Sequence, residues 1–200
     1  GVDEKQQTRY RRKRPHMTIN KTWQLWRDEK MTEEDGALLR KKAADLPVPF
    51  NAAASKDIQT LVEAFLKRDD ALGLAAPQIG ISKRIIAFKV KDFDRKGLSG
   101  KGDWEVLINA RITQLRGETE VMNEGCLSCP DISVEVTRAT EIKVKAVDIN
   151  GNKVNKRYTG FLARIVQHEI DHLDGRLVVD HEGTISYPKE KQAFFDKIFK

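Results

Sequence analysis

The sequence predicts an α+β domain whose sheet is antiparallel at least in part. Short strand patterns follow one another through the middle of the chain, between residues 84 and 147. Asn150-Gly151 is typical of a two-residue hairpin turn and indicates antiparallel pairing of the segments on either side. Helical patterns lie before and after this region, at 57–69 and 159–175. Helices together with an antiparallel sheet make an α+β arrangement.

The first helix is expected at 57–69, "DIQTLVEAFLKRD". Its apolar residues recur at i, i+3, i+4, i+7 and i+8, the stripe of an amphipathic helix that packs one face on a core. They are Ile58, Leu61, Val62, Phe65 and Leu66.

Four strands are expected next, at 84–90, 105–112, 132–137 and 141–147. The segment 91–104 between the first two is rich in glycine and charge and predicts a solvated loop.

The second helix is expected from Thr159, as N-cap, to Gly175, as stop. His168 and His172 continue the apolar stripe of Phe161 and Ile165, so both imidazoles should face the core. A third helix is expected at 187–200, where a proline in the first turn precedes an aromatic face.

Composition and length suit one soluble globular domain: 200 residues, 40% apolar and 33% charged. No apolar run is long enough to span a bilayer, and no secretory signal pattern is present. Residues 1–16 carry six Lys or Arg and two acidic residues, hence most of the net charge of +6. Such a basic, flexible tail fits an RNA-binding arm, a transit-peptide remnant or vector-derived sequence, and a junction at His16-Met17 favours the last. Residues 17–200 are expected to form the single domain.

The pair His168 and His172 predicts a metal site. At i, i+4 on a helix both imidazoles can bind one ion, whereas burial without partners would cost about 1–3 kcal/mol each. Glu169 makes the motif H-E-x-x-H, which supplies a general base beside a catalytic metal. The motif alone would usually indicate a zinc peptidase. However, Val178 stands where the metzincin pattern has its third histidine.

The third ligand is better sought upstream, at Cys126 in "NEGCLSCP". A cysteine thiolate with two imidazoles is a known catalytic set that leaves one position open. The chain has only two cysteines, and the spacing C-x-x-C of Cys126 and Cys129 points to metal or redox chemistry in an intracellular protein.

Three segments together resemble the peptide deformylase family: "LGLAAPQIG" (72–80), "EGCLS" (124–128) and "QHEIDHLDG" (167–175). They occur in that order, and the resemblance covers roughly residues 32–183. It implies mainly antiparallel sheets around a central metal-binding helix, with a C-terminal helix. It also implies a hydrolase of protein biosynthesis that removes the formyl group from N-formylmethionine, in a bacterial-type cytoplasm or an organelle.

The resemblance assigns roles residue by residue. Cys126, His168 and His172 would bind one divalent metal ion, Fe(II) in most of the family, with zinc, nickel or cobalt as substitutes. Glu169 would be general base and acid, and Gln78 with the backbone N–H of Leu127 would stabilise the oxyanion. The substrate-binding residues would be Leu72, Gly73, Gln78, Leu127, Phe161 and Ile165, with an apolar pocket for the methionine side chain. Glu124 and Arg138 would support the ligands.

Two positions depart from the family pattern. Ala71 replaces a glycine, so a positive φ there would be strained. Cys129 replaces an aliphatic residue, which suggests that it packs and that the C-x-x-C is incidental.

Two rival functions remain at this stage, an HExxH metallopeptidase and a non-enzymatic zinc module closed by Cys129. The expected partners are N-formylmethionyl peptides and, through the basic C-terminal helix, the ribosome; neither DNA nor a membrane is expected.

Overall fold

The computed structural model describes residues 21–98 and 102–200. The basic segment 1–16 lies outside the described residues, so its nature stays a prediction. The elements run in the order β1 Trp26–Arg27, β2 Lys30–Met31, α2 Glu33–Leu39, α3 Ala52–Leu66, β3 Gly73–Ala75, β4 Ile85–Lys89, β5 Trp104–Cys126, β6 Cys129–Val147, β7 Lys153–Thr159, α4 Gly160–Leu173, β8 Ile185–Ser186 and α5 Gln192–Phe199. Short 3₁₀ turns lie at Ala76–Ile79, Val178–Asp180 and Lys189–Lys191. In the part of the chain described, no helix is long and apolar enough to cross a membrane.

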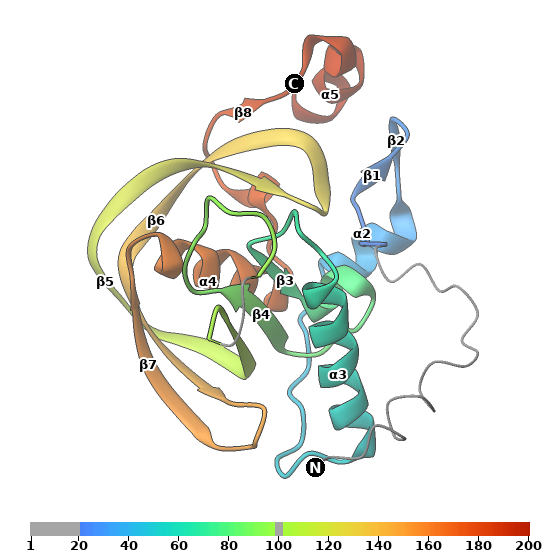
Figure 1. Ribbon diagram of the computed structural model, residues 1–200. Helices are drawn as coiled ribbons and strands as arrows, with labels where there is room; N and C mark the ends of the chain where they lie inside the picture. The colour runs from blue at the N-terminus through green and yellow to red at the C-terminus, as the bar shows by residue number, and fades with distance from the viewer. Residues whose placement is uncertain (1–20, 99–101) are drawn as a thin grey trace.

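The α+β prediction is confirmed. The main sheet has the order β3-β4-β5-β6-β7, β8 pairs with β6, and every pairing is antiparallel. A separate hairpin joins β1 and β2. The long β5–β6 ribbon curves around α4, which lies at the centre of the molecule, while α3 lies on the other side of β3 and β4 (Figure 1).

Strand β4 is buried along its whole length because helices cover both of its faces. Ile86 and Phe88 belong to the core cluster that contains the apolar residues of α4. Ile85 and Ala87 point the other way, because side chains alternate along a strand, and pack with α3. The unbroken apolar run "IIAF" is therefore what a strand between two helix layers requires.

One prediction about strand boundaries is wrong. The segments 132–137 and 141–147 are not two strands but parts of the single strand β6. Ile132, Val134 and Val136 face inward, and Arg138 continues on the same buried face. The arginine looks like a break in the apolar pattern, but its charge is neutralised by the carboxylates of Glu124 and Asp171, so the strand continues through it.

Two helices begin elsewhere than predicted: α3, and the third helix, which was expected at 187–200 and covers Gln192–Phe199 as α5. Helix α3 begins at Ala52, five residues before the predicted start, because the Asn51 side chain accepts a hydrogen bond from the Ala54 N–H at 2.8 Å and caps it. Helix α4 lies where predicted, with Thr159 in the N-cap position. Gly175 ends it with φ +73°, a conformation that favours glycine.

The two ends of the described chain meet on β6. Trp26 packs edge-on against Phe195, with ring centroids 5.4 Å apart, and lies in the same core cluster as Val134 and Val136 of β6. Phe195, on α5, is only 1% exposed. The aromatic face of the C-terminal helix therefore packs on the domain itself, and α5 forms the top of the molecule (Figure 1).

Candidate active site

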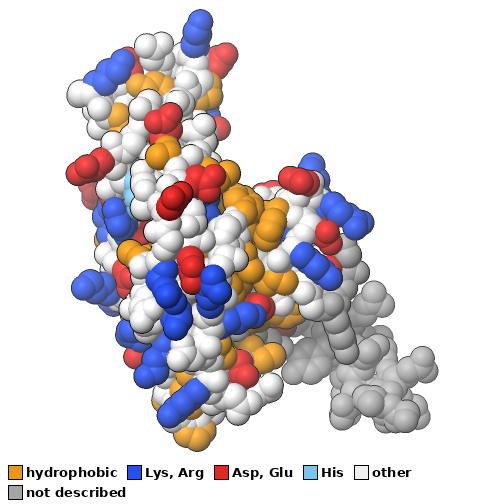
Figure 2. Space-filling view, turned by 90° about the vertical axis from the view of Figure 1, so that its left-hand side faces the viewer, with side chains coloured by type: hydrophobic (Ala, Val, Ile, Leu, Met, Phe, Trp, Pro, Cys, Tyr) orange, Lys and Arg blue, Asp and Glu red, His pale blue; other side chains and the backbone are white. Residues whose placement is uncertain are grey.

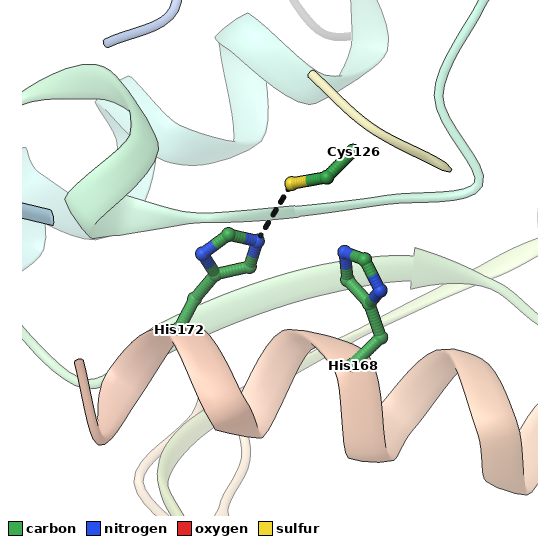
Figure 3. A group of neighbouring side chains, drawn as sticks. All are labelled: Cys126, His168 and His172. Atoms are coloured by element: carbon green, nitrogen blue, oxygen red, sulfur yellow. Dashed lines mark hydrogen bonds between the residues drawn. The ribbon is translucent and has the colours of Figure 1, made fainter. Parts of the chain in front are cut away.

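Helix α4 presents the two histidines to a cysteine from the sheet. His168 and His172 lie one turn apart on the helix, and Cys126, the last residue of β5, faces them (Figure 3). The Cys126 Sγ is 3.3 Å from the His172 Nε2. One ligand atom from each of the three residues lies within 4.8 Å of those of the other two. These distances are short enough for all three atoms to bind a single ion.

The donor set fits a first-row divalent metal. A thiolate and two imidazoles suit iron, cobalt, nickel and zinc, and three protein ligands leave a coordination position for water or substrate. The His168 Nδ1 is 2.8 Å from the Glu124 Oε1, which leaves the Nε2 of that ring for the ion. Cys129 is not part of this group of ligand atoms.

Glu124 contacts two arginines as well as the Nδ1 of His168. Its carboxylate accepts hydrogen bonds from Arg138 at 2.7 and 2.8 Å and from Arg164 at 2.7 Å. Burial alone would raise the pKa of Glu124, but the bonds from Arg138 and His168 hold it well below its usual value. Glu124 is therefore an anion at neutral pH, a suitable acceptor for the N–H of a metal-binding histidine.

The ligand groups affect one another's protonation. The pKa of Cys126 is held well below its usual value by a hydrogen bond with the Cys129 thiol, which acts against burial, by the charge of His172, and by hydrogen bonds with both imidazoles. Burial disfavours a charged His168, but hydrogen bonds to Cys126 and Glu124 outweigh it and raise the pKa of that imidazole. The thiolate form of Cys126 that a metal requires is thus favoured by its surroundings.

Glu169 is a buried carboxyl group with unused hydrogen-bonding capacity. It is 4% exposed, and its Oε2 has no hydrogen-bond partner among the described residues. Burial raises the pKa of Glu169 despite the nearby imidazoles. Such an oxygen beside a metal site is available to exchange a proton with water or substrate.

The backbone approaches Glu169 closely at Gly73, on β3. A Cβ built on Gly73 would lie 2.8 Å from the Glu169 Cδ, a distance that real Cβ atoms do not show. The absence of a side chain at Gly73 thus makes room for the carboxyl group. The family resemblance assigned Gly73 only to substrate binding.

Gln78 is held in one orientation. Its Oε1 accepts a hydrogen bond from the Ala75 N–H at 3.0 Å. Because only the amide oxygen can accept, this bond determines the positions of Oε1 and Nε2. The Nε2 therefore points to the Ser128 Oγ, at 3.2 Å, and to the Cys126 Sγ, at 3.8 Å. A donor is placed beside the metal ligands.

A cavity of about 720 Å³ opens beside these groups. The predicted residues that line it are Leu72, Gly73, Gln78, Cys126, Leu127, Phe161, Ile165, His168 and Glu169. His172 lies beneath it, 1% exposed. Figure 2 shows hydrophobic side chains gathered in a hollow on one face of the molecule, with charged side chains around it.

Some of the predictions around the site need adjustment. Ala71 is not among the residues with a positive φ, so the strain considered there is absent. The histidine downstream of the helix, His181, is not one of the three ligand residues, as its spacing from the motif indicates, and it contacts Asp171 with 3.0 Å between the His181 Nε2 and the Asp171 Oδ2. The loop at 91–98, expected only to be solvated, packs Phe93 edge-on against Phe161, with 5.1 Å between ring centroids.

Arg164 and Phe93 were missed as neighbours of the site. Arg164 lies four residues before His168, hence on the same face of α4, and it is 5% exposed. A charged residue on an otherwise apolar helix face could have indicated a buried acidic partner. Nothing in the sequence near Phe93 indicates its contact with a residue so far along the chain.

Comparison with known proteins agrees with a metal site formed by one cysteine and two histidines. The family model described as polypeptide deformylase matches residues 6–189. The chain belongs to the peptide deformylase family. Members of this family remove the N-formyl group from newly made chains in a metal-dependent reaction, and this is the activity of the chain.

Individual relatives support the family assignment. A peptide deformylase from Thermotoga maritima is 41% identical over 143 residues, which are 72% of this chain and 80% of that protein. Peptide deformylase 1 from Clostridium perfringens is 40% identical over 151 residues, 74% of this chain and 93% of the relative. The crystal structure of the Thermotoga maritima enzyme matches with a TM-score of 0.61, 40% identity, and 72% and 90% coverage. A class I type b deformylase from Acinetobacter baumannii with Met-Ala-Ser bound matches with a TM-score of 0.63, 32% identity, and 72% and 91% coverage.

Gly73→Ala should separate the placement of Glu169 from metal binding. The added methyl group must displace the Glu169 carboxyl group, and a shift of about 1 Å in a catalytic group costs about 10²-fold in rate. We expect kcat for formyl-Met peptides to fall by about that factor while metal content, measured by elemental analysis, stays unchanged.

Gly125→Ala is the matched control, because a Cβ there meets nothing closer than the Ile132 carbonyl oxygen at 3.9 Å. Equal activity of the Gly73 variant and the wild type would show that Glu169 has room to adjust.

Proposed function

We propose that Cys126, His168 and His172 hold the divalent ion of this deformylase and that Glu169 is its general base and acid. The observation that carries the proposal is the unpartnered Oε2 of Glu169, buried at the cavity next to the ligand group. A divalent ion held there would supply Lewis-acid activation of water and of the formyl oxygen.

Glu169 moves the protons. Its carboxylate takes a proton from the attacking water and then, as a carboxylic acid, delivers that proton to the leaving amine. A raised pKa serves both steps, because it brings the group closer to the pH at which it must accept and release a proton.

Gln78 and the backbone N–H of Leu127 stabilise the oxyanion of the tetrahedral intermediate. The hydrogen bond from Ala75 keeps the Gln78 Nε2 directed to the ligand side without reorientation during the reaction. Preorganised donors of this kind are worth about 10²–10³ in rate each.

The substrate is a peptide that begins with N-formylmethionine. Leu72, Leu127, Phe161 and Ile165 provide an apolar lining for the methionine side chain. The tight contact between Gly73 and Glu169 leaves little space beside the reacting carbon, which favours formyl, the smallest acyl group. The Acinetobacter baumannii structure has Met-Ala-Ser bound, a peptide that begins with methionine and carries no formyl group, as a product of this reaction would.

The two rival functions are less well supported. Val178, where a metzincin would have a histidine, is an apolar residue that is only 2% exposed. A closed zinc module would need Cys129 as fourth ligand, and it would leave the unpartnered carboxylate of Glu169 without a role. We place the enzyme in a compartment where translation starts with N-formylmethionine, a bacterial-type cytoplasm or an organelle.

Glu169→Ala tests the assigned base. The variant should keep its metal and its melting temperature, because the ligands are untouched, but lose about 10²–10⁴ in kcat. Turnover of a formyl-Met peptide is compared with elemental analysis of the same preparation. Near wild-type turnover would refute the role of Glu169.

Exchange of each cysteine for alanine tests the ligand set. Cys126→Ala removes the anionic ligand and should lose most metal and activity. Cys129→Ala should keep the metal and the fold, and lose at most the packing of a small side chain. Comparable metal loss and unfolding in both variants would instead indicate a closed four-ligand site.

Fe(II) is the proposed native ion, with zinc, nickel and cobalt as substitutes. The thiolate and imidazole ligands accept all four metals, so the availability of each metal in the cell determines which ion is bound. Enzyme prepared without oxygen should contain iron, lose activity in air, and regain it on anaerobic addition of Fe(II). Activity that is indifferent to air would count against iron.

The lysines of the C-terminal segment are proposed to bind the ribosome. The aromatic face of α5 is used for packing, which leaves the basic side chains, and Lys189 and Lys197 are exposed. Lys189→Glu combined with Lys197→Glu should weaken co-sedimentation with ribosomes and leave hydrolysis of small peptides intact. Lys145→Glu with Lys153→Glu, on β6 and β7, is the control. Unchanged co-sedimentation of the first pair would exclude docking through these lysines.

A further inference from the structure

Cys126 and Cys129 face each other across a two-residue hairpin turn. Cys126 ends β5, Cys129 begins β6, and the two are directly paired in the antiparallel register. Directly paired residues have Cα atoms about 4.5–5.5 Å apart. Disulfides bridge Cα separations of about 4.4–6.8 Å, so the backbone can accept a bond here without rearrangement.

Cys126 and Cys129 also lie at the same cavity. Each thiol shifts the pKa of the other, and both residues line this active-site cavity. Small solutes that enter the cavity can therefore reach them, although Cys129 is only 1% exposed. Cys129 is outside the metal-binding group, so it has no part in the proposed reaction.

We propose that Cys126 and Cys129 form a reversible disulfide when the enzyme meets a hydroperoxide, and that this bond withdraws Cys126 from the metal. The inference rests on the proposed role of Cys126 as a ligand. The oxidised protein would keep only two imidazoles for the ion, a set that binds a divalent metal more weakly than one with a thiolate.

The reaction with hydrogen peroxide takes place in two balanced steps. The Cys126 thiolate attacks one peroxide oxygen, the O–O bond breaks, and hydroxide leaves, so that Cys126 becomes a sulfenic acid. The Cys129 sulfur then attacks the Cys126 sulfur, the S–O bond breaks, and water leaves with the thiol proton. Overall, the two sulfurs lose two electrons and one hydrogen peroxide becomes two waters. One of these waters forms when the hydroxide takes up a proton from solvent.

Cys129 thereby protects the ligand from irreversible damage. A sulfenic acid without a nearby thiol is oxidised further to sulfinic and sulfonic acids, which thiol reductants do not reverse. A partner paired directly across the hairpin forms the disulfide before a second peroxide arrives. Reduction followed by metal uptake then restores the site.

The test uses the nickel-loaded enzyme, so that oxidation of iron plays no part. It is treated with a small excess of hydrogen peroxide, denatured, alkylated and digested with trypsin. Both cysteines lie in the peptide 117–138. We expect this peptide to be two hydrogen masses lighter and free of alkyl groups, with nickel released, and most of the starting activity to return after dithiothreitol and nickel.

Cys129→Ala and Cys129→Ser are the comparison, each measured relative to its own untreated sample. Both should accumulate oxygen mass on Cys126 and lose activity that dithiothreitol does not restore; the serine keeps a polar group in the site if the alanine variant folds poorly. An oxygenated Cys126 with an alkylated Cys129 in the wild type would overturn the proposal. So would full recovery of the variants, or inactivation that leaves both thiols free.

A failure of the proposed function would give a different result from a failure of the disulfide proposal. Nickel-loaded wild type without deformylase activity before oxidation would contradict that function, while peptide mass and nickel release would still decide whether the disulfide forms.

Discussion

The structure of the site depends on one buried carboxylate, that of Glu124. It lies on β5, is only 8% exposed, and accepts hydrogen bonds from Arg138 on β6 and from Arg164 and His168 on α4. One anion thus joins the β5–β6 hairpin to helix α4, whose Arg164 lies 40 residues after Glu124. Loss of one partner in such a buried group leaves an uncompensated charge, which costs about 3–5 kcal/mol. The position of α4 against the β5–β6 ribbon is therefore tightly constrained.

The positions of the three proposed metal ligands follow from this constraint. Cys126 lies two residues after Glu124 on the same strand, and His168 donates to Glu124 from the helix. Fixing the carboxylate therefore fixes the cysteine relative to the first histidine, and the helix places His172 one turn further on. Arg138 also binds Asp171 at 2.9 Å, next to His172 in the sequence, so the same arginine holds the helix at a second point.

The sequence predicted the residues of the candidate metal site better than the structure that surrounds them. The i, i+4 spacing of His168 and His172, with a glutamate between them, is a local pattern that helix geometry converts into a site. The continuity of β6 through Arg138 could not be read in this way, because an arginine in a strand looks like a surface residue until its partners are known. The contact of Gly73 with Glu169 joins β3 to α4, and such long-range contacts leave no local pattern. The short β1–β2 hairpin has too few residues to show alternation.

The hairpin that carries Cys126 has two sides with different surroundings. One side faces the cavity, where both cysteines lie. On the other, the N-terminal segment runs along the turn: the Leu25 N–H donates to the Ser128 carbonyl at 2.9 Å, and the Trp26 indole donates to the Pro130 carbonyl at 3.0 Å. Phe195 of α5 packs on that indole. The aromatic face of the C-terminal helix therefore supports the hairpin that carries Cys126, which explains why this face is buried.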